Sequence, residues 1–113
     1  MPVDAQTAAI LVGAVEAASA LDQYNARCRS DVSGRHTDNL NKALVGKLRL
    51  TVISVLDDHF PEHNYRRAQA RLQEQFMETL RQADGCKGAK DSGLPQTLRE
   101  RYQSALEAIK ALP

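Results

Sequence analysis

Apolar residues recur at spacings of three and four along most of the chain, which is the pattern of helices that bury one face. The first such stretch runs from Asp4 to Cys28. Its apolar face carries Ala8, Leu11, Val15, Ala18, Leu21, Tyr24 and Cys28. A turn follows at residues 31–34, with Asp31, Ser33 and Gly34. We expect Thr37 or Asp38 to cap the next helix with a side-chain oxygen.

A second helix is predicted from Asn39 to His59. Its apolar face carries Leu40, Leu44, Leu48, Val52, Val55 and Leu56, and Val45 and Ile53 widen it. Residues 48–55 are also rich in β-branched side chains and partly alternate, so a strand is the competing interpretation. Because no second segment offers itself as a pairing strand, the helix is favoured.

The Phe60-Pro61 step ends the second helix, because proline disfavours helical geometry at the residue before it and suits the first turn of a new helix. We therefore predict a third helix from Pro61 to Ala83. Its core positions are Tyr65, Ala68, Leu72, Phe76 and Leu80. A fourth helix is predicted from Pro95 to the end of the chain, with Leu98, Tyr102, Ala105, Leu106, Ile109 and Leu112 inside.

Residues 85–93 hold three glycines and are expected to form a loop between the last two helices. The segment lacks the preceding strand and the glycine-lysine spacing of a phosphate-binding loop. Four amphipathic helices with short connections normally pack as an antiparallel bundle. The sequence thus predicts an all-α, four-helix antiparallel bundle, or helical-hairpin assembly, forming a single domain over residues 1–113.

The charges of the chain almost cancel, with 15 Lys and Arg against 14 Asp and Glu. This balance argues against nucleic-acid binding and against a polybasic membrane anchor. No apolar run approaches the roughly 20 residues of a membrane span. Aromatic residues are few and tryptophan is absent, so the core is built from Leu, Val, Ile and Ala. A small core of this kind gains from a covalent cross-link.

The two cysteines, Cys28 and Cys86, are expected to meet. In an up-down-up-down bundle the first helix ends at one pole, the second returns, and the third brings the chain back to the first pole. Both thiols then lie at one end, as a disulfide with Cα atoms within about 7 Å requires. Structural disulfides persist outside the cytosol, so the sequence predicts a periplasmic or secreted protein. The competing interpretation is two unrelated thiols in a cytosolic protein.

The segment from Ala8 to Ala20 looks at first like a signal-peptide core with a small-residue cleavage site. Asp4 stands where a basic region is expected, and Glu16 interrupts the apolar run, so we interpret it as an amphipathic helix. Met1 to Asp4 is then either a cytosolic start or the position from which a signal peptide has been removed. The cysteine argument favours the second.

The densest cluster of chemically active side chains lies between the second and third predicted helices, in residues 57–63. His59 and His63, with Asp58 and Glu62, are donor types that zinc, copper or nickel accepts. A proline between the histidines prevents a standard pair on one helix. In the alternative interpretation, Glu62 stabilises the first turn of the third helix and the segment is an ordinary polar turn.

A second candidate site is a cationic patch at the cysteine pole, suited to an acidic partner or an anionic polymer. It comprises Arg27, Arg29, Arg35, Lys87 and Lys90. Ordinary solvated loop charge is the alternative interpretation.

Catalytic constellations are not evident. No Ser-His-Asp arrangement is recognisable, and His36 is the only histidine expected near Cys28 or Cys86 to form a thiolate. No cofactor is implied.

Tyr24 and Cys28 closing the first helix, with Cys86 after the third, resemble the pattern of small exported bacterial proteins. These include secretin pilotins, helical immunity proteins that neutralise periplasmic amidase toxins, and secreted helical proteins of unknown function. No functional residue carries over. We expect a non-enzymatic protein that acts by binding a protein partner, with a homodimer as one possibility. The alternative is a periplasmic metal- or small-ligand-binding protein that uses the region of His59 and His63.

Overall fold

The computed structural model describes residues 3–113, which form helices and no strand. The helices are α1 (Ala5–Cys28), α2 (Arg35–Leu48), α3 (Val52–Asp58), α4 (Tyr65–Gln82), α5 (Gly85–Asp91) and α6 (Leu94–Lys110). The all-α prediction is therefore confirmed, and the competing strand over residues 48–55 does not form. Met1 and Pro2, at the expected processing position, lie outside the described residues.

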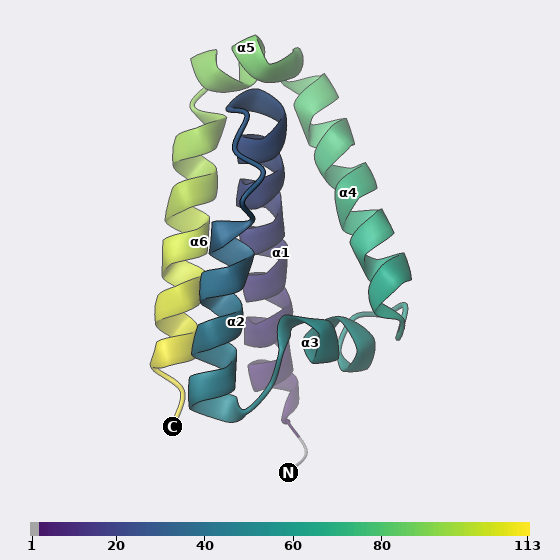
Figure 1. Ribbon diagram of the computed structural model, residues 1–113, viewed down its shortest axis with the longest axis vertical. Helices are drawn as coiled ribbons and strands as arrows, with labels where there is room; N and C mark the ends of the chain where they lie inside the picture. Colours follow the sequence, from purple (N-terminus) through teal and green to yellow (C-terminus); the bar gives the residue numbers. More distant parts are fainter. Residues whose placement is uncertain (1–2) are drawn as a thin grey trace.

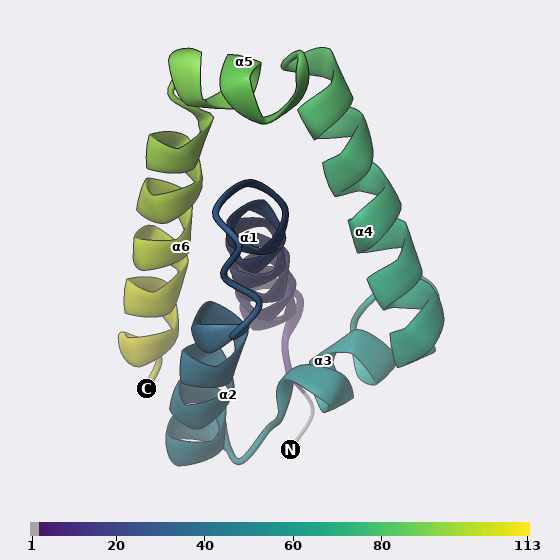
Figure 2. The same cartoon turned by 45° about the horizontal axis from the view of Figure 1, so that its top comes forward.

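Helix α1 occupies the centre of the molecule. Figures 1 and 2 show α2 and α6 along one side of it and α4 on another, while α3 and α5 cross at opposite ends. Because α1 is enclosed on several sides, its inner positions are mostly small or aliphatic. Those exposed by 3% or less are Leu11, Ala14, Val15, Ala17, Ala18, Leu21 and Tyr24. Alanines on a central helix let the surrounding helices approach closely, which explains the alanine-rich sequence of this segment.

The first helix begins almost where the sequence predicts, since Asp4 is its N-cap and its side chain accepts a hydrogen bond from the Thr7 amide at 2.7 Å. The second begins earlier than predicted, at Arg35 rather than Asn39. Its cap is not Thr37 or Asp38 but a carboxylate on α1. Asp22 accepts hydrogen bonds from the amides of His36 at 3.1 Å and Thr37 at 2.8 Å. This contact between α1 and α2 joins residues 14 and 15 positions apart and could not be predicted from the local sequence.

The predicted continuous helix from Asn39 to His59 is wrong, because it breaks at residues 49–51. Arg49 has a left-handed backbone (φ 56°), and Thr51 starts α3 with a capping box that includes Ser54. The change in direction leaves Val45 and Ile53, expected to widen the buried stripe, each 46% exposed. The Thr51 cap competes with helix continuation and wins, because it satisfies the amides at the start of α3.

Helix α4 begins at Tyr65 rather than at the predicted Pro61. Asn64 is its N-cap and accepts a hydrogen bond from the Arg67 amide at 3.0 Å, while Asp57 accepts one from the Tyr65 amide at 2.6 Å. Phe60 is fully buried at this corner. The proline therefore marks the end of one helix correctly but lies in the connection that precedes the next.

The glycine-rich segment, predicted to be a loop, forms the short helix α5 between two turns. Gly85 and Gly93 have positive φ angles of 81° and 82°, which glycine adopts without steric strain. Gly88 is needed for a different reason, since a Cβ atom there would lie 1.8 Å from the carbonyl oxygen of Ala83. The glycines thus build a tight corner between α4 and α6.

Cys28 and Cys86 meet as predicted, with their sulfur atoms 2.05 Å apart and their Cα atoms 5.4 Å apart. The bond joins the end of α1 to α5, at the upper end of the molecule in Figure 1. Although the second predicted helix is broken, α2 and α3 still return the chain to the opposite pole. Helix α4 then runs in the same direction as α1 (Figure 1), so both cysteines lie at the same end of the molecule, as predicted.

The detailed prediction of a four-helix bundle is not confirmed. Helices α1, α2 and α6 pack together, whereas α4 packs on α1, α3 and α5. Helices α4 and α6 both lie against α1 but are not packed on each other (Figure 2). Within residues 3–113, no helix combines the length and apolar character needed to cross a membrane.

We expect the disulfide to be a large part of the stability. It closes a loop with a sequence separation of 58 residues, for which the chain-entropy relation gives about 4 kcal/mol. The Cys28→Ser/Cys86→Ser double variant should lose about that much unfolding free energy in urea titrations. Dithiothreitol should destabilise the wild type and leave the double variant unchanged. Equal stability of the two proteins would contradict this expectation.

The two glycines Gly88 and Gly46 should respond oppositely to alanine. Gly88→Ala is expected to cost about 1–3 kcal/mol, because the new methyl group overlaps the α4 backbone. Gly46 lies in α2, and a Cβ atom there has no other atom within 4 Å. Gly46→Ala should therefore stabilise the protein by about 0.5–1 kcal/mol through helix propensity. Thermal denaturation of both variants measures the difference, and the same sign for both would refute it.

Candidate functional site

The residues proposed as metal ligands lie at the corner between α3 and α4 without converging. His59 caps the end of α3, and His63 is exposed with its Nδ1 atom 3.3 Å from the carbonyl oxygen of Asp57. Glu62 is engaged by Arg71 of α4, which donates from Nε to Oε2 and from Nη2 to Oε1 at 3.2 Å. Asp58 is exposed at the last turn of α3. Glu62 thus serves as an ion-pair partner.

Across residues 3–113, no three His, Cys, Asp or Glu side chains are grouped so that they could hold a metal ion. His36 lies elsewhere, with its Nδ1 atom 2.8 Å from Asp22 and its ring 4.9 Å from that of Tyr102. The Tyr102 hydroxyl donates to the His36 carbonyl at 3.2 Å, and burial raises the pKa of Tyr102. These contacts join α2 to α1 and α6 to α2. The histidine is thus engaged in packing between helices, away from the corner of His59 and His63.

The cationic patch is partly assembled by the fold. Arg29, Lys87 and Lys90 line one open cavity of about 680 Å³ next to the disulfide. Arg99 of α6 lines the same cavity and was missed by the sequence analysis. It stands six residues after Gly93, in the first half of a helix that the topology brings to the cysteine pole. This position in the sequence could have been used to predict that Arg99 lies at the cysteine pole.

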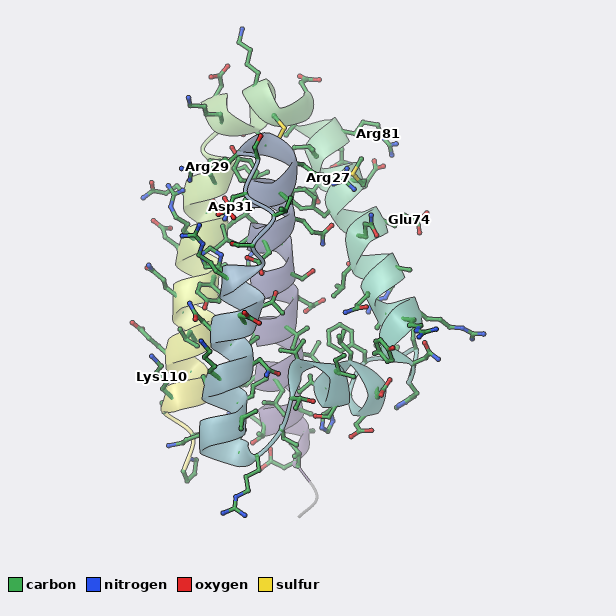
Figure 3. All side chains as sticks on the ribbon, viewed as in Figure 1. Arg27, Arg29, Asp31, Glu74, Arg81 and Lys110 are labelled. Atoms are coloured by element: carbon green, nitrogen blue, oxygen red, sulfur yellow. A yellow bond between two sulfur atoms is a disulfide. The ribbon has the colours of Figure 1, made fainter. Side chains whose placement is uncertain are left out.

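The other two predicted patch residues lie apart from this cavity. Arg35 lines a smaller neighbouring cavity of about 240 Å³ and is paired with Asp31 at 2.5 Å. Arg29 and Arg99 line both cavities. Arg27 lines neither, and Figure 3 shows it on the side of α1 toward α4, whereas Arg29 lies toward α6. The cations that share the cavity next to the disulfide are therefore Arg29, Lys87, Lys90 and Arg99, without Arg27 and Arg35.

A third feature, not predicted from the sequence, is a groove of about 750 Å³ along α1. Helix α1 forms its floor, and α4 and α6 form its walls, in the space where those two helices do not pack on each other. Small and apolar side chains dominate the lining. They include Ala9, Ile10, Gly13, Ala14, Ala20, Leu72, Phe76, Leu94, Leu98, Ala105 and Ala108. In a closed four-helix bundle, packed helices would have filled this space. The predicted bundle therefore contained no groove.

Gly13 stands on the groove floor in the middle of α1. A Cβ atom built on it would have no atom within 4 Å, and its φ angle is not positive. Glycine in a helix interior costs about 1 kcal/mol relative to alanine. No contact in the described part of the chain requires residue 13 to lack a methyl group. The glycine instead leaves the floor of the groove low at this point.

The cysteine chemistry considered for catalysis does not apply here, because Cys28 and Cys86 are bonded to each other and no free cysteine exists in the chain. The hydrogen-bonded pair of Asp22 and His36 is explained by capping of α2. The groove and the cavity next to the disulfide, called the disulfide-end cavity from here on, therefore remain as candidate sites for a partner or ligand.

The Glu62 and Arg71 pair should make stability depend on pH. The hydrogen bond from Arg71 holds the pKa of Glu62 below its ordinary value. Because the folded pKa is the lower one, the pair stabilises the fold at neutral pH, and this contribution is lost as the pH falls through the ordinary Glu range and below. Wild-type protein should exceed Glu62→Gln in melting temperature at pH 7, with the gap closing toward about pH 3.

The control is Glu74→Gln, which removes the same charge from an exposed position of α4 that makes no ion pair among the described residues (Figure 3). It should leave the pH dependence of the melting temperature close to that of the wild type. A gap between wild type and Glu62→Gln that is as large at pH 3 as at pH 7 would contradict the assignment.

Comparisons of the chain with protein-family models, with curated proteins and with solved structures found no match.

Proposed function

We propose that this protein is an exported, non-enzymatic interaction protein whose groove binds an amphipathic helix of a partner protein. The observation that carries the proposal is the groove itself. It is an apolar channel with one helix as floor and two as walls. Helix-in-groove binding uses this arrangement, with the apolar face of the incoming helix anchored at positions three and four residues apart.

The floor of the groove favours a close approach by the partner backbone. Ala9, Gly13 and Ala20 project little above α1, so a helix resting there comes nearer than large side chains allow. Gly13 is the sharpest indication, because it weakens α1 by about 1 kcal/mol and no contact in the described chain needs it. A partner that approaches α1 at this point accounts for the glycine.

Two charged residues at the groove define the chemistry of the partner. Glu16 on α1 and Arg101 on α6 both line it, are exposed, and make no ion pair among the described residues. A complementary helix carries a basic residue against Glu16 and an acidic residue against Arg101 beside its apolar stripe. Complementary charges set orientation and suppress wrong partners more than they add affinity.

Export is proposed on the strength of the disulfide, since a bond of this kind persists in the periplasm or outside the cell. A second copy of this chain is the competing occupant of the groove. Val45 and Ile53, the half-exposed residues near the break between α2 and α3, do not line the groove. They therefore add nothing to a dimer formed through it.

The location of binding is testable with a photoreactive phenylalanine in the producing cell. We place it at Ala9 and Ala108 in the groove, and at Ile53 as an exposed apolar control on α3. The groove positions should cross-link to a helical segment of one other protein, identified by mass spectrometry, and the control should not. Cross-links to a second copy of this chain, or equal labelling from Ile53, would overturn the proposal.

Variants of Gly13 separate binding from folding. Gly13→Ala should raise the unfolding free energy by about 0.5–1 kcal/mol and weaken capture of the cross-linked partner, and Gly13→Leu should abolish the capture. Gly46→Ala is the matched control, because it adds the same methyl group to a helix position outside the groove. It should stabilise the protein similarly and leave capture unchanged. Normal capture by a folded Gly13→Leu variant would exclude the groove as the binding site.

A further inference from the structure

The disulfide-end cavity gathers positive charge from three separate parts of the chain. Arg29 comes from the connection after α1, Lys87 and Lys90 come from α5, and Arg99 comes from α6. None of the four makes an ion pair within residues 3–113. No acidic side chain of the described residues lines this cavity. Asp31, which lines the neighbouring cavity, forms an ion pair with Arg35.

The disulfide brings two of these residues close together along the backbone. Arg29 directly follows Cys28, and Lys87 directly follows Cys86, so two of the cations are each one residue from a bonded cysteine whose partner Cα is 5.4 Å away. The disulfide itself, Tyr24 and Pro95 contribute the apolar part of the lining. The four cations therefore line a cavity whose wall includes the Cys28–Cys86 disulfide.

Like charges placed together repel each other and destabilise the free protein. The chain as a whole has 15 basic and 14 acidic residues, so a cavity lined by four cations and no acid does not follow from an overall excess of positive charge. An anion that occupies the cavity removes the repulsion. This local imbalance points to a ligand with several negative charges in a small volume.

The types of cation narrow the ligand class. Guanidinium groups match the paired oxygens of phosphate in a two-pronged geometry, and lysines bind phosphate as point charges. A cavity of about 680 Å³ is of small-molecule size. Arg29 and Arg99 also line the adjoining cavity, so a chain of linked phosphates can follow them from one cavity to the other. We propose that the disulfide-end cavity binds an oligophosphate, either free or as the phosphate chain of a nucleotide.

The test is calorimetric titration of the full oxidised protein at 150 mM NaCl with sodium tripolyphosphate, ATP and citrate. Tripolyphosphate should bind. Arg29→Gln and Arg99→Gln should each weaken binding by about tenfold, from the loss of charge-assisted hydrogen bonds. Arg27→Gln is the matched control, since it removes the same charge two residues from Arg29 but lies outside both cavities. It should bind as the wild type does.

If ATP binds with the same affinity as tripolyphosphate, the phosphate chain alone is recognised. If ATP binds more tightly, the ligand is a nucleotide. Both outcomes support the site. No heat with tripolyphosphate, citrate binding as tightly, or equal losses in Arg27→Gln and Arg29→Gln would overturn it. The groove variant Gly13→Leu should bind tripolyphosphate normally, so this result and that of the partner-binding experiment are separable.

Thermal denaturation gives an independent readout. In the absence of ligand, Lys87→Gln and Arg99→Gln should melt higher than the wild type, because each relieves repulsion among the four cations. Tripolyphosphate should raise the melting temperature of the wild type more than that of either variant. The same ligand-induced rise in all three proteins would contradict the proposed site.

Discussion

Enclosure of α1 is the constraint on which the rest of this structure depends. One helix of 24 residues is surrounded by neighbours, and its inner positions are aliphatic or small enough for each neighbour to come close. Asp22, on the same helix, supplies the carboxylate that starts α2, and Cys28 at its end supplies the link to α5. The other helices are thus ordered largely through their contacts with α1.

The helical periodicity and the approximate ends of α1, α4 and α6 could be predicted from the sequence, because a buried face imposes a regular spacing on its residues. The cysteine pairing followed from the direction of successive helices and survived an error in one of them. The break at Arg49 was missed, since it depends on the competition between helix continuation and the Thr51 cap. The corner at Gly88 was missed as well, because its cause is a close contact with the end of α4 that local sequence does not reveal.

The candidate sites were less accessible to sequence reasoning for a related reason. His59, His63, Asp58 and Glu62 are close along the chain, but a turn can point neighbouring side chains in different directions, and Arg71 engages Glu62. Arg99 joins Arg29 only because α6 starts at the disulfide end. The groove exists because α4 and α6 are not packed on each other. The apolar spacing along each helix does not indicate which other helix it will pack against.

The short crossing helices α3 and α5 brace the two walls of the groove. Its walls are tied together at one end through α5, which is itself bonded to α1, and α3 supports α4 against α1 at the other end. We expect a channel braced in this way to keep its width in the free protein. Little conformational freedom would then be lost when the proposed partner helix binds, and a small contact area would give tighter binding than the area alone indicates.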